Sequence, residues 1–130
     1  MPPYLHFVPV NFEVGDVWWE RLSASGFDSQ KPAVVASTGV SMYLTNAAIL
    51  ATLRQLATLA QGSTFIMSFM LPIELNDPAI RPGVERAAAG AKANGTPWLS
   101  FFTPAEMLAQ AREAGFGNVE HISAAALAER

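Results

Sequence analysis

The stretch AVVASTGVSMYLT, residues 33–45, decides the fold of this chain. It opens with apolar, partly β-branched residues that do not alternate with polar ones. Such a run predicts a strand over residues 33–38 that is buried on both faces, as in a parallel sheet covered by helices. Ser37, Thr38 and Gly39 then lie where that strand ends. Ligands of open α/β sheets bind at this edge because loops leaving neighbouring strands diverge there. The turn is therefore our leading site candidate.

Strand-forming and helix-forming segments alternate around this stretch. Aromatic and β-branched runs predict further strands over residues 4–10 and 63–71, although Pro9 makes the first of them an edge or a strand end. Helical patterns over residues 16–25 and 45–60 separate the three strands. This alternation predicts an α/β fold with a mostly parallel sheet flanked by helices.

Capping residues and apolar spacing define these two helices. Asp16 caps the first, and Gly26 stops it. Thr45 caps the second, which Gln61 and Gly62 end. The expected buried stripes are Trp18, Trp19 and Leu22 in the first helix, and Ile49, Leu53, Leu56 and Ala60 in the second.

The second half of the chain contains three further predicted helices. Prolines punctuate residues 72–102, where an Ala-rich segment over 83–93 predicts a short helix that leaves the sheet. Thr103-Pro104-Ala105-Glu106 is a capping box with proline at the first helical position, and this helix runs to Gly115. A short strand over 118–122 and a helix over 124–130 complete the pattern.

Composition excludes several classes of function. The 130 residues are 51% hydrophobic, which is ample for one domain, and they hold only eight Lys and Arg at a net charge of −3. That balance argues against a nucleic-acid partner. The chain has no cysteine, which removes disulfides and thiolate chemistry. Neither a signal peptide nor a membrane-spanning run is recognisable, so we expect a cytoplasmic protein without membrane attachment.

The sequence contains no recognisable catalytic or metal-binding constellation. His6 and His121 lie in predicted strands and are too few for a metal site, and Glu74 and Asp77 lie in a loop that fixes no separation between them. No serine sits in a Gly-x-Ser-x-Gly elbow. Gly115-Phe116-Gly117 follows a helix, where it predicts a helix-ending turn and not a phosphate loop. We therefore predict no metal, and the catalytic residues stay unknown.

Several segments together resemble one known family. They are FVPVNFE from Phe7, STGVSMYLT from Ser37, AQGSTFIMSF from Ala60, GTPWLSFFTPAEMLAQAREAGF from Gly95 and HISAAALAER from His121. The chain resembles the leucine carboxyl methyltransferase-like group of S-adenosylmethionine-dependent methyltransferases, including its actinobacterial putative members. The resemblance implies a partial Rossmann-like class I methyltransferase fold. It also implies that residues 1–130 are the C-terminal portion of a single domain truncated at both ends, without the N-terminal half that carries the glycine-rich cofactor loop.

The resemblance also implies which residues would meet cofactor and substrate. Asn11-Phe12 matches an Asp-Leu pair on the adenine side of S-adenosylmethionine, and Asn keeps one acceptor while losing the charge. Ser37, Thr38 and Gly39 would offer hydroxyl and backbone groups near its methionine part, although many relatives carry Glu at the position of Thr38. Met42 and Tyr43 would form the wall on the substrate side.

Two functions follow from this pattern. The first is methyl transfer from S-adenosylmethionine to an oxygen or carboxylate acceptor of unknown identity. The sulfonium donor is already activated, so positioning supplies most of the acceleration. The alternative is a non-catalytic α/β remnant that acts as a binding or oligomerisation module.

An unpaired sheet edge is a physical consequence of the resemblance. In the family, two strands absent here lie between the strand matching residues 4–10 and the strand matching residues 33–38. The latter then exposes one edge, and such edges pair with other strands. Either residues 4–10 close in beside it, or the chain forms a homo-oligomer, or it is only marginally stable.

Overall fold

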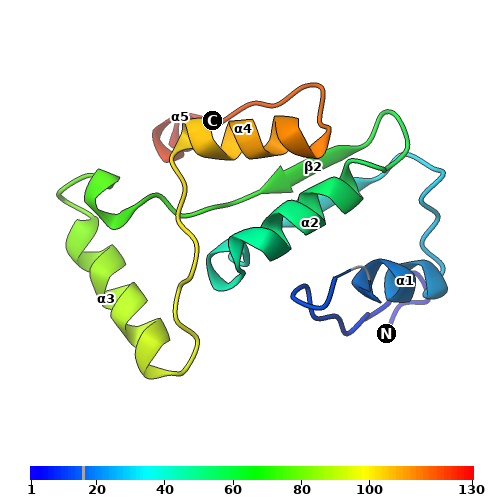
Figure 1. The fold of residues 1–130 in the computed structure, drawn as a ribbon, viewed down its shortest axis with the longest axis horizontal. Coiled ribbons are helices and arrows are strands. Elements are labelled where there is room, and N and C mark those ends of the chain that lie inside the picture. The colour runs from blue at the N-terminus through cyan, green and yellow to red at the C-terminus, as the bar shows by residue number, and fades with distance from the viewer. Residues whose placement is uncertain (16) are drawn as a thin grey trace.

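The computed structural model describes residues 1–15 and 17–130 (Figure 1). Helices and two short strands alternate through residue 67, and helices follow, which confirms the predicted α/β class. The elements are α1 (Val17–Ala24), β1 (Val34–Ser37), the 3₁₀ helix η1 (Ser41–Tyr43), α2 (Asn46–Leu56), β2 (Thr64–Met67), the 3₁₀ helix η2 (Ile73–Leu75), α3 (Arg81–Ala93), α4 (Pro104–Ala114) and α5 (Ala124–Ala128).

The two strands form a parallel pair. Val34 of β1 lies opposite Thr64 of β2, and Ser37 lies opposite Met67. Helix α2 makes the connection between them, as parallel strands require. The predicted parallel pairing is confirmed, and both strands end at the same edge of the sheet.

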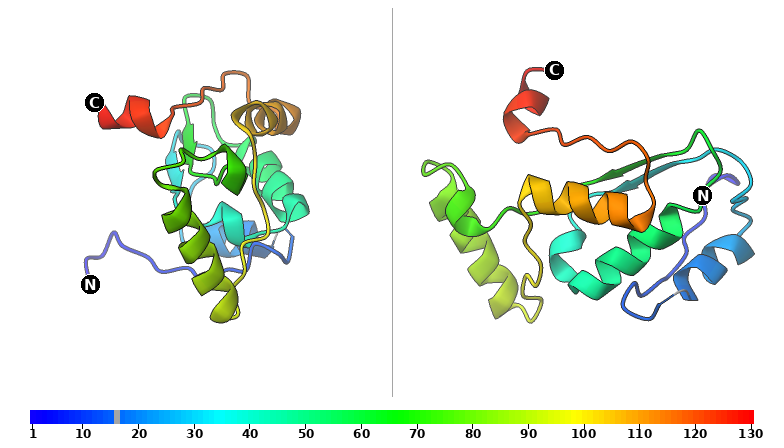
Figure 2. Two further views of the ribbon diagram at one scale, coloured as in Figure 1. Left: turned by 90° about the vertical axis from the view of Figure 1, so that its left-hand side faces the viewer. Right: turned by 45° about the horizontal axis from the view of Figure 1, so that its top comes forward.

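Only one face of this sheet is covered. Exposure alternates along both strands, and Val34 is 77% exposed while Ile66 is 54% exposed. Figure 2 (left) shows α2 and α4 on one side of the strands, whereas the N-terminal end and α5 project on the other. The prediction of strands buried on both faces is therefore wrong. An apolar run without alternation does not reveal whether a second layer of helices exists.

The core lies between the covered face of the sheet and the helices α2 and α4. Its centre consists of Ile49, Leu53, Phe102 and Met107, all at most 7% exposed. Phe65 on the inner face of β2 stacks on Phe116 beyond α4, with ring centroids 6.2 Å apart. This core fixes α2, and therefore the loops at the ends of the strands, against the sheet.

Side-chain caps begin three of the helices. The Thr45 hydroxyl accepts from the Ala48 amide at 3.2 Å, and the Thr103 hydroxyl accepts from the Glu106 amide at 3.2 Å. Ser123 caps α5 in the same way at 3.1 Å. Both predicted threonine caps are confirmed. Helix α2 ends at Leu56, so Ala60 lies beyond it and not on its buried stripe.

The end of α4 and the course of α3 also follow prediction. Gly115 has a φ of +118°, and its amide donates to the carbonyls of Ala111 and Arg112, so it caps α4. Helix α3 contains no buried residue and projects away from the two strands (Figure 1). Residues 81–93 therefore form the predicted excursion off the sheet.

Two predicted strands are absent. Residues 4–10 and 118–122 have no strand partner and adopt no regular structure. A strand requires a neighbour with which its amides and carbonyls pair, and no described segment lies in register beside either run. The composition of both runs favours strands, but composition does not determine whether a neighbouring strand is available for pairing.

The N-terminal helix packs through aromatic rings. Trp18 is 7% exposed, with its ring 5.3 Å from Phe12 and 5.3 Å from Trp19. The ring of Trp19 also lies 6.0 Å from that of Phe27. The predicted cap Asp16 lies outside the described residues. Trp18 therefore joins α1 to the loop that precedes it.

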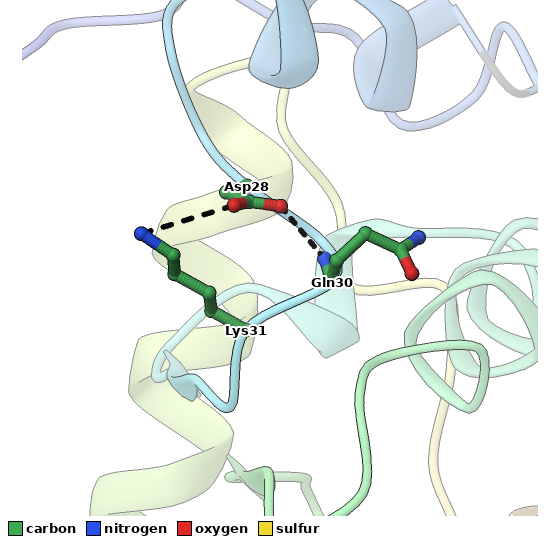
Figure 3. A network of polar contacts seen from close by, with 3 residues as sticks. All are labelled: Asp28, Gln30 and Lys31. Carbon is green, nitrogen blue, oxygen red and sulfur yellow. Dashed lines mark hydrogen bonds and ion pairs between the residues drawn. The ribbon is translucent and has the colours of Figure 1, made fainter.

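A tight turn leads from α1 into β1. Asp28 accepts a hydrogen bond from the Gln30 amide at 2.9 Å, and its second oxygen lies 4.0 Å from the Lys31 ammonium (Figure 3). Both charged side chains are largely exposed, so water screens their attraction. The amide contact shapes the turn by satisfying a backbone donor.

Candidate functional site

The carboxyl edge of the sheet brings together the two stretches that the sequence singled out. Phe12 and Ser37 line the same small cavity, together with Val40, Ser41, Leu44, Ile49, Thr52 and Met67. The loop over residues 11–13 and the turn over residues 37–43 therefore lie at one edge of the sheet. We call these two segments the rim.

Serine side chains hold the turn after β1. The Gly39 amide donates to the Ser68 hydroxyl at 2.8 Å, and the Ser41 hydroxyl donates to the Ser68 carbonyl at 2.9 Å. Ser41 is only 2% exposed. Because Ser68 directly follows β2, these contacts fix the loop of one strand to the end of the other. No pattern in the sequence indicated this role for Ser41 and Ser68.

A glutamate fastens the other part of the rim. Glu13 accepts from the Thr45 amide at 2.8 Å and from the Thr45 hydroxyl at 2.9 Å. One carboxylate thus binds the residue that caps α2, across 32 positions of sequence. No pattern in the sequence revealed this partner. The contact ties the loop that carries Asn11 to the start of α2.

The predicted cofactor residues fall into two groups. Asn11, Thr38 and Gly39 are exposed at the rim, whereas Phe12 and Ser37 are half-buried in the cavity wall. The Asn11 side-chain oxygen accepts from the Glu13 amide at 3.0 Å, so part of its hydrogen-bonding capacity is used within the loop. Its amino group stays available to a ligand.

The two predicted substrate residues point to different places. Met42 is 7% exposed, and its carbonyl accepts from the Leu99 amide at 2.6 Å. Tyr43 is 43% exposed and lines an open hollow of about 600 Å³ with residues from the segment after α3. Those residues are Gly95, Thr96, Pro97 and Leu99. Of the two, Tyr43 is the one that faces open space.

The enclosed volume at the rim is small. The cavity beside Phe12 and Ser37 measures about 20 Å³, which is room for roughly one water molecule. This cavity therefore has no room for a nucleoside-sized ligand, and the groups that the rim presents to its surroundings include the exposed ones of Asn11, Thr38 and Gly39.

The described residues contain neither a candidate metal site nor a helix that could span a membrane. Over residues 1–15 and 17–130, no three carboxylate or imidazole side chains gather closely enough to hold a metal ion. In the same part of the chain, every helix is too short or too polar to cross a bilayer.

Comparison with known proteins identifies the segment that carries the rim. Residues 1–57 match the family model described as leucine carboxyl methyltransferase. Residues 1–57 are thus similar to this family, and we call them the leucine carboxyl methyltransferase-like segment. Neither the curated proteins nor the solved structures gave a match. The family resemblance is thus confirmed over residues 1–57, and beyond residue 57 it stays a prediction.

The leucine carboxyl methyltransferase-like segment includes every residue that the sequence proposed for the site. Asn11, Phe12, the turn over 37–39, Met42 and Tyr43 all lie within it. It ends just after α2, so β2, which supplies Ser68, lies outside it. The assignment of the whole chain to the C-terminal portion of a methyltransferase domain stays a prediction.

Gly39 in this segment offers a test of the rim's backbone. Its φ is +71°, and an added Cβ would meet no atom within 4 Å. Gly39→Ala is therefore expected to lower the free energy of unfolding by about 1–2 kcal/mol through backbone strain alone. Urea denaturation followed by circular dichroism measures the loss.

Gly90→Ala is the matched control for this substitution. Gly90 lies inside α3, its added Cβ also meets nothing, and its φ is not positive. Here alanine is expected to stabilise the helix by about 0.5–1 kcal/mol. If both variants shifted stability in the same direction, the left-handed turn would not be what constrains Gly39.

Proposed function

We propose that this chain belongs to an S-adenosylmethionine-dependent methyltransferase that acts on an oxygen or carboxylate acceptor. The supporting observation is that Phe12 and Ser37, both within the leucine carboxyl methyltransferase-like segment, line one cavity at the end of a strand in a parallel pair. Ligands of α/β folds bind at that edge.

Each rim residue has a chemical role in this proposal. The Asn11 side chain would bind the adenosine part of the cofactor, and Phe12 would supply apolar contact beneath it. The Thr38 hydroxyl and the exposed backbone of Gly39 would bind the polar groups of the methionine part. When bound, the cofactor supplies an activated methyl group, so the residues of the chain would orient the cofactor and the acceptor and exclude water from them.

The acceptor side is assigned to the hollow beside Tyr43. Tyr43 and Leu99 present apolar surface there, and none of its lining residues is charged. An uncharged or aromatic acceptor would fit such a lining better than a highly charged one. Met42 serves this wall indirectly, because its carbonyl ties the segment carrying Leu99 to η1.

Titration with the cofactor tests the proposal on the full chain. S-adenosylmethionine and its demethylated product are added to ¹⁵N-labelled protein, and amide shifts are recorded. We expect saturable shifts confined to residues 11–13 and 37–43, with unchanged amides at residues 81–93. A dissociation constant of ~1 mM corresponds to a binding free energy of about −4 kcal/mol. If the chemical shifts of the rim amides did not change at ~1 mM ligand, cofactor binding at this edge would be disproved.

Asn11→Asp sharpens the same experiment. Aspartate keeps the oxygen that accepts from the Glu13 amide, so the loop should persist, while the amino group is replaced by a charged acceptor. Charge-assisted hydrogen bonds are about twice as strong as neutral ones, so we expect about three- to tenfold tighter binding of S-adenosylmethionine.

Gln61→Glu controls for the added negative charge. Gln61 is exposed in the turn before β2, at the opposite end of the strands from the rim. This variant should leave the affinity unchanged, because exposed charges beyond roughly 10 Å are screened in 0.1 M salt. An equal gain in both variants would show general attraction of the cationic cofactor and not a contact at Asn11.

A non-catalytic role as a binding or oligomerisation module is the second candidate. The rim encloses only about 20 Å³, and one face of the sheet is uncovered. Rim amides that ignore the cofactor, together with self-association of the chain, would favour this alternative.

A further inference from the structure

Helix α1 contacts the loop that leads into the rim at two points. The Trp18 ring lies 5.3 Å from the Phe12 ring, with the two planes tilted by 59°. Three positions later in the helix, the Arg21 guanidinium donates to the Pro9 carbonyl at 2.8 Å. Residues three apart are neighbours on one face of a helix. One face of α1 therefore contacts the loop on both sides of Asn11.

Packing holds the Trp18 ring in place. Trp18 is 7% exposed, and its ring meets the Trp19 ring edge to face, with centroids 5.3 Å apart and planes at 85°. Trp19 in turn lies 6.0 Å from Phe27, which follows the helix. Rings in this arrangement attract one another beyond the burial of their apolar area. We call Phe27, Trp19, Trp18 and Phe12 the aromatic row. The row joins the segment after α1 to the rim.

Phe12 is the member of the aromatic row that lies in the rim. It is half-buried and lines the same small cavity as Ser37. Its neighbours in the chain are Asn11, which we assign to the adenosine part of the cofactor, and Glu13, whose carboxylate accepts from the Thr45 amide at 2.8 Å. A displacement of the Phe12 ring would therefore move both neighbours through the backbone that they share.

The contacts of Asn11 itself are local. Its side-chain oxygen accepts from the Glu13 amide at 3.0 Å, and its carbonyl accepts from the Val14 amide at 3.2 Å. Such contacts shape the loop but leave its distance from the turn over residues 37–39 unset. A binding group must be held within about 0.5 Å of its productive position by neighbours whose rotamers are locked by packing. Trp18 meets that requirement, because it is buried and contacts the loop directly.

We propose that Trp18 is a positioning residue for the cofactor. Its ring holds Phe12, and through Phe12 it sets Asn11 at the distance from the turn over residues 37–39 that one ligand can bridge. The Arg21 contact fixes the same loop on its N-terminal side. The identity of the ligand, S-adenosylmethionine, rests on the proposed function, whereas the placement of the loop by Trp18 does not.

Amide hydrogen exchange of the full chain without ligand tests the placement of the loop. Trp18→Leu keeps an apolar side chain and removes the ring, so the amides of Val14 and Thr45, which bond to residues of the loop, should exchange about three- to tenfold faster. The amide of the core residue Phe102, which donates to the Met70 carbonyl, should keep its rate. Trp18→Phe retains a ring and should restore most of the protection. Equal acceleration of all three amides would mean that Trp18 supports only the fold, which would overturn the proposal.

Phe12→Leu tests the same contact from its other side and is at less risk of unfolding, because Phe12 is half-buried. It should accelerate exchange of the Val14 and Thr45 amides, and adding Trp18→Leu to it should change their rates little further. That result is expected when both substitutions remove one shared interaction. Additive effects would mean that Trp18 acts on the loop by another route, contrary to the proposal.

Titration with S-adenosylmethionine tests the consequence for binding. Trp18→Leu should raise the dissociation constant by about three- to tenfold, and Trp18→Phe should recover most of the loss. Phe27→Leu is the matched control, because it removes another half-buried ring of the aromatic row whose ring contact, among the described residues, is with Trp19. Its exchange rates and its affinity should both match those of the natural chain.

Two results of the titration would count against the positioning role. One is an equal dissociation constant in Trp18→Leu and the natural chain, and the other is an equal loss of affinity in Trp18→Leu and Phe27→Leu. A natural chain that binds no cofactor would instead refute the proposed function, and the exchange rates would still decide the role of Trp18.

Discussion

Phe102→Ala is expected to lower the free energy of unfolding by about 3–5 kcal/mol, which is a large part of the 5–15 kcal/mol typical of a domain. Phe102 is 2% exposed and lies among Ile49, Leu53 and Met107, so its ring joins α2 to α4. Its amide donates to the Met70 carbonyl at 2.9 Å, and alanine keeps that bond. The loss therefore reports the cavity left by the ring. Urea denaturation monitored by circular dichroism measures it.

Leu99→Ala is the control for the ring deletion. Leu99 lies in the same irregular segment, three positions earlier, but it is 54% exposed. Its truncation should change stability by about 0.5 kcal/mol or less, as at other surface sites. Equal losses at the two positions would show that the segment as a whole, and not the Phe102 ring, holds the helices together.

Thr45→Ala is expected to cost about 2 kcal/mol, the upper part of the range for a lost helix cap. The substitution removes the hydroxyl that accepts from the Ala48 amide and that also donates to Glu13. One change therefore weakens both the start of α2 and the anchor of the loop over residues 11–13. Thermal unfolding measures the stability, and amide hydrogen exchange of residues 46–49 reports fraying of the helix.

Thr45→Ser distinguishes the effect of the hydroxyl on stability from that of the threonine methyl group. Serine caps helices at least as well as threonine and can still donate to Glu13, so its stability should lie close to that of the natural chain. The amide of residue 45 also donates to Glu13 in every variant. A serine variant as unstable as the alanine variant would show that the threonine methyl group, and not the hydroxyl, is what matters.

The position of the site follows largely from local patterns. The apolar run over residues 33–36, the turn after it and the cap at Thr45 each act within a few residues, and all three are found where predicted. The family match over residues 1–57 agrees with the resemblance that these segments carry. Short-range signals therefore sufficed to place the rim at the end of a parallel strand.

The contacts that hold the rim together depend on residues far apart in the chain. The bonds between Glu13 and Thr45, and between Ser41 and Ser68, join positions 32 and 27 residues apart. Each of these residue types is common on loops, and nothing in its local sequence selects a partner. Spatial proximity alone makes the pairing.

The sequence by itself determined where α2 and α4 begin and where α4 ends, because caps and apolar spacing act over one or two turns of helix. It also determined that two strands run parallel, because strands that alternate with helices are joined by crossover connections. Only the tertiary structure decided that one sheet face is bare, that residues 4–10 and 118–122 form no strand, and that Phe102 lies at the centre of the core. Burial and strand pairing require a second surface, and whether one is present depends on the arrangement of the whole chain.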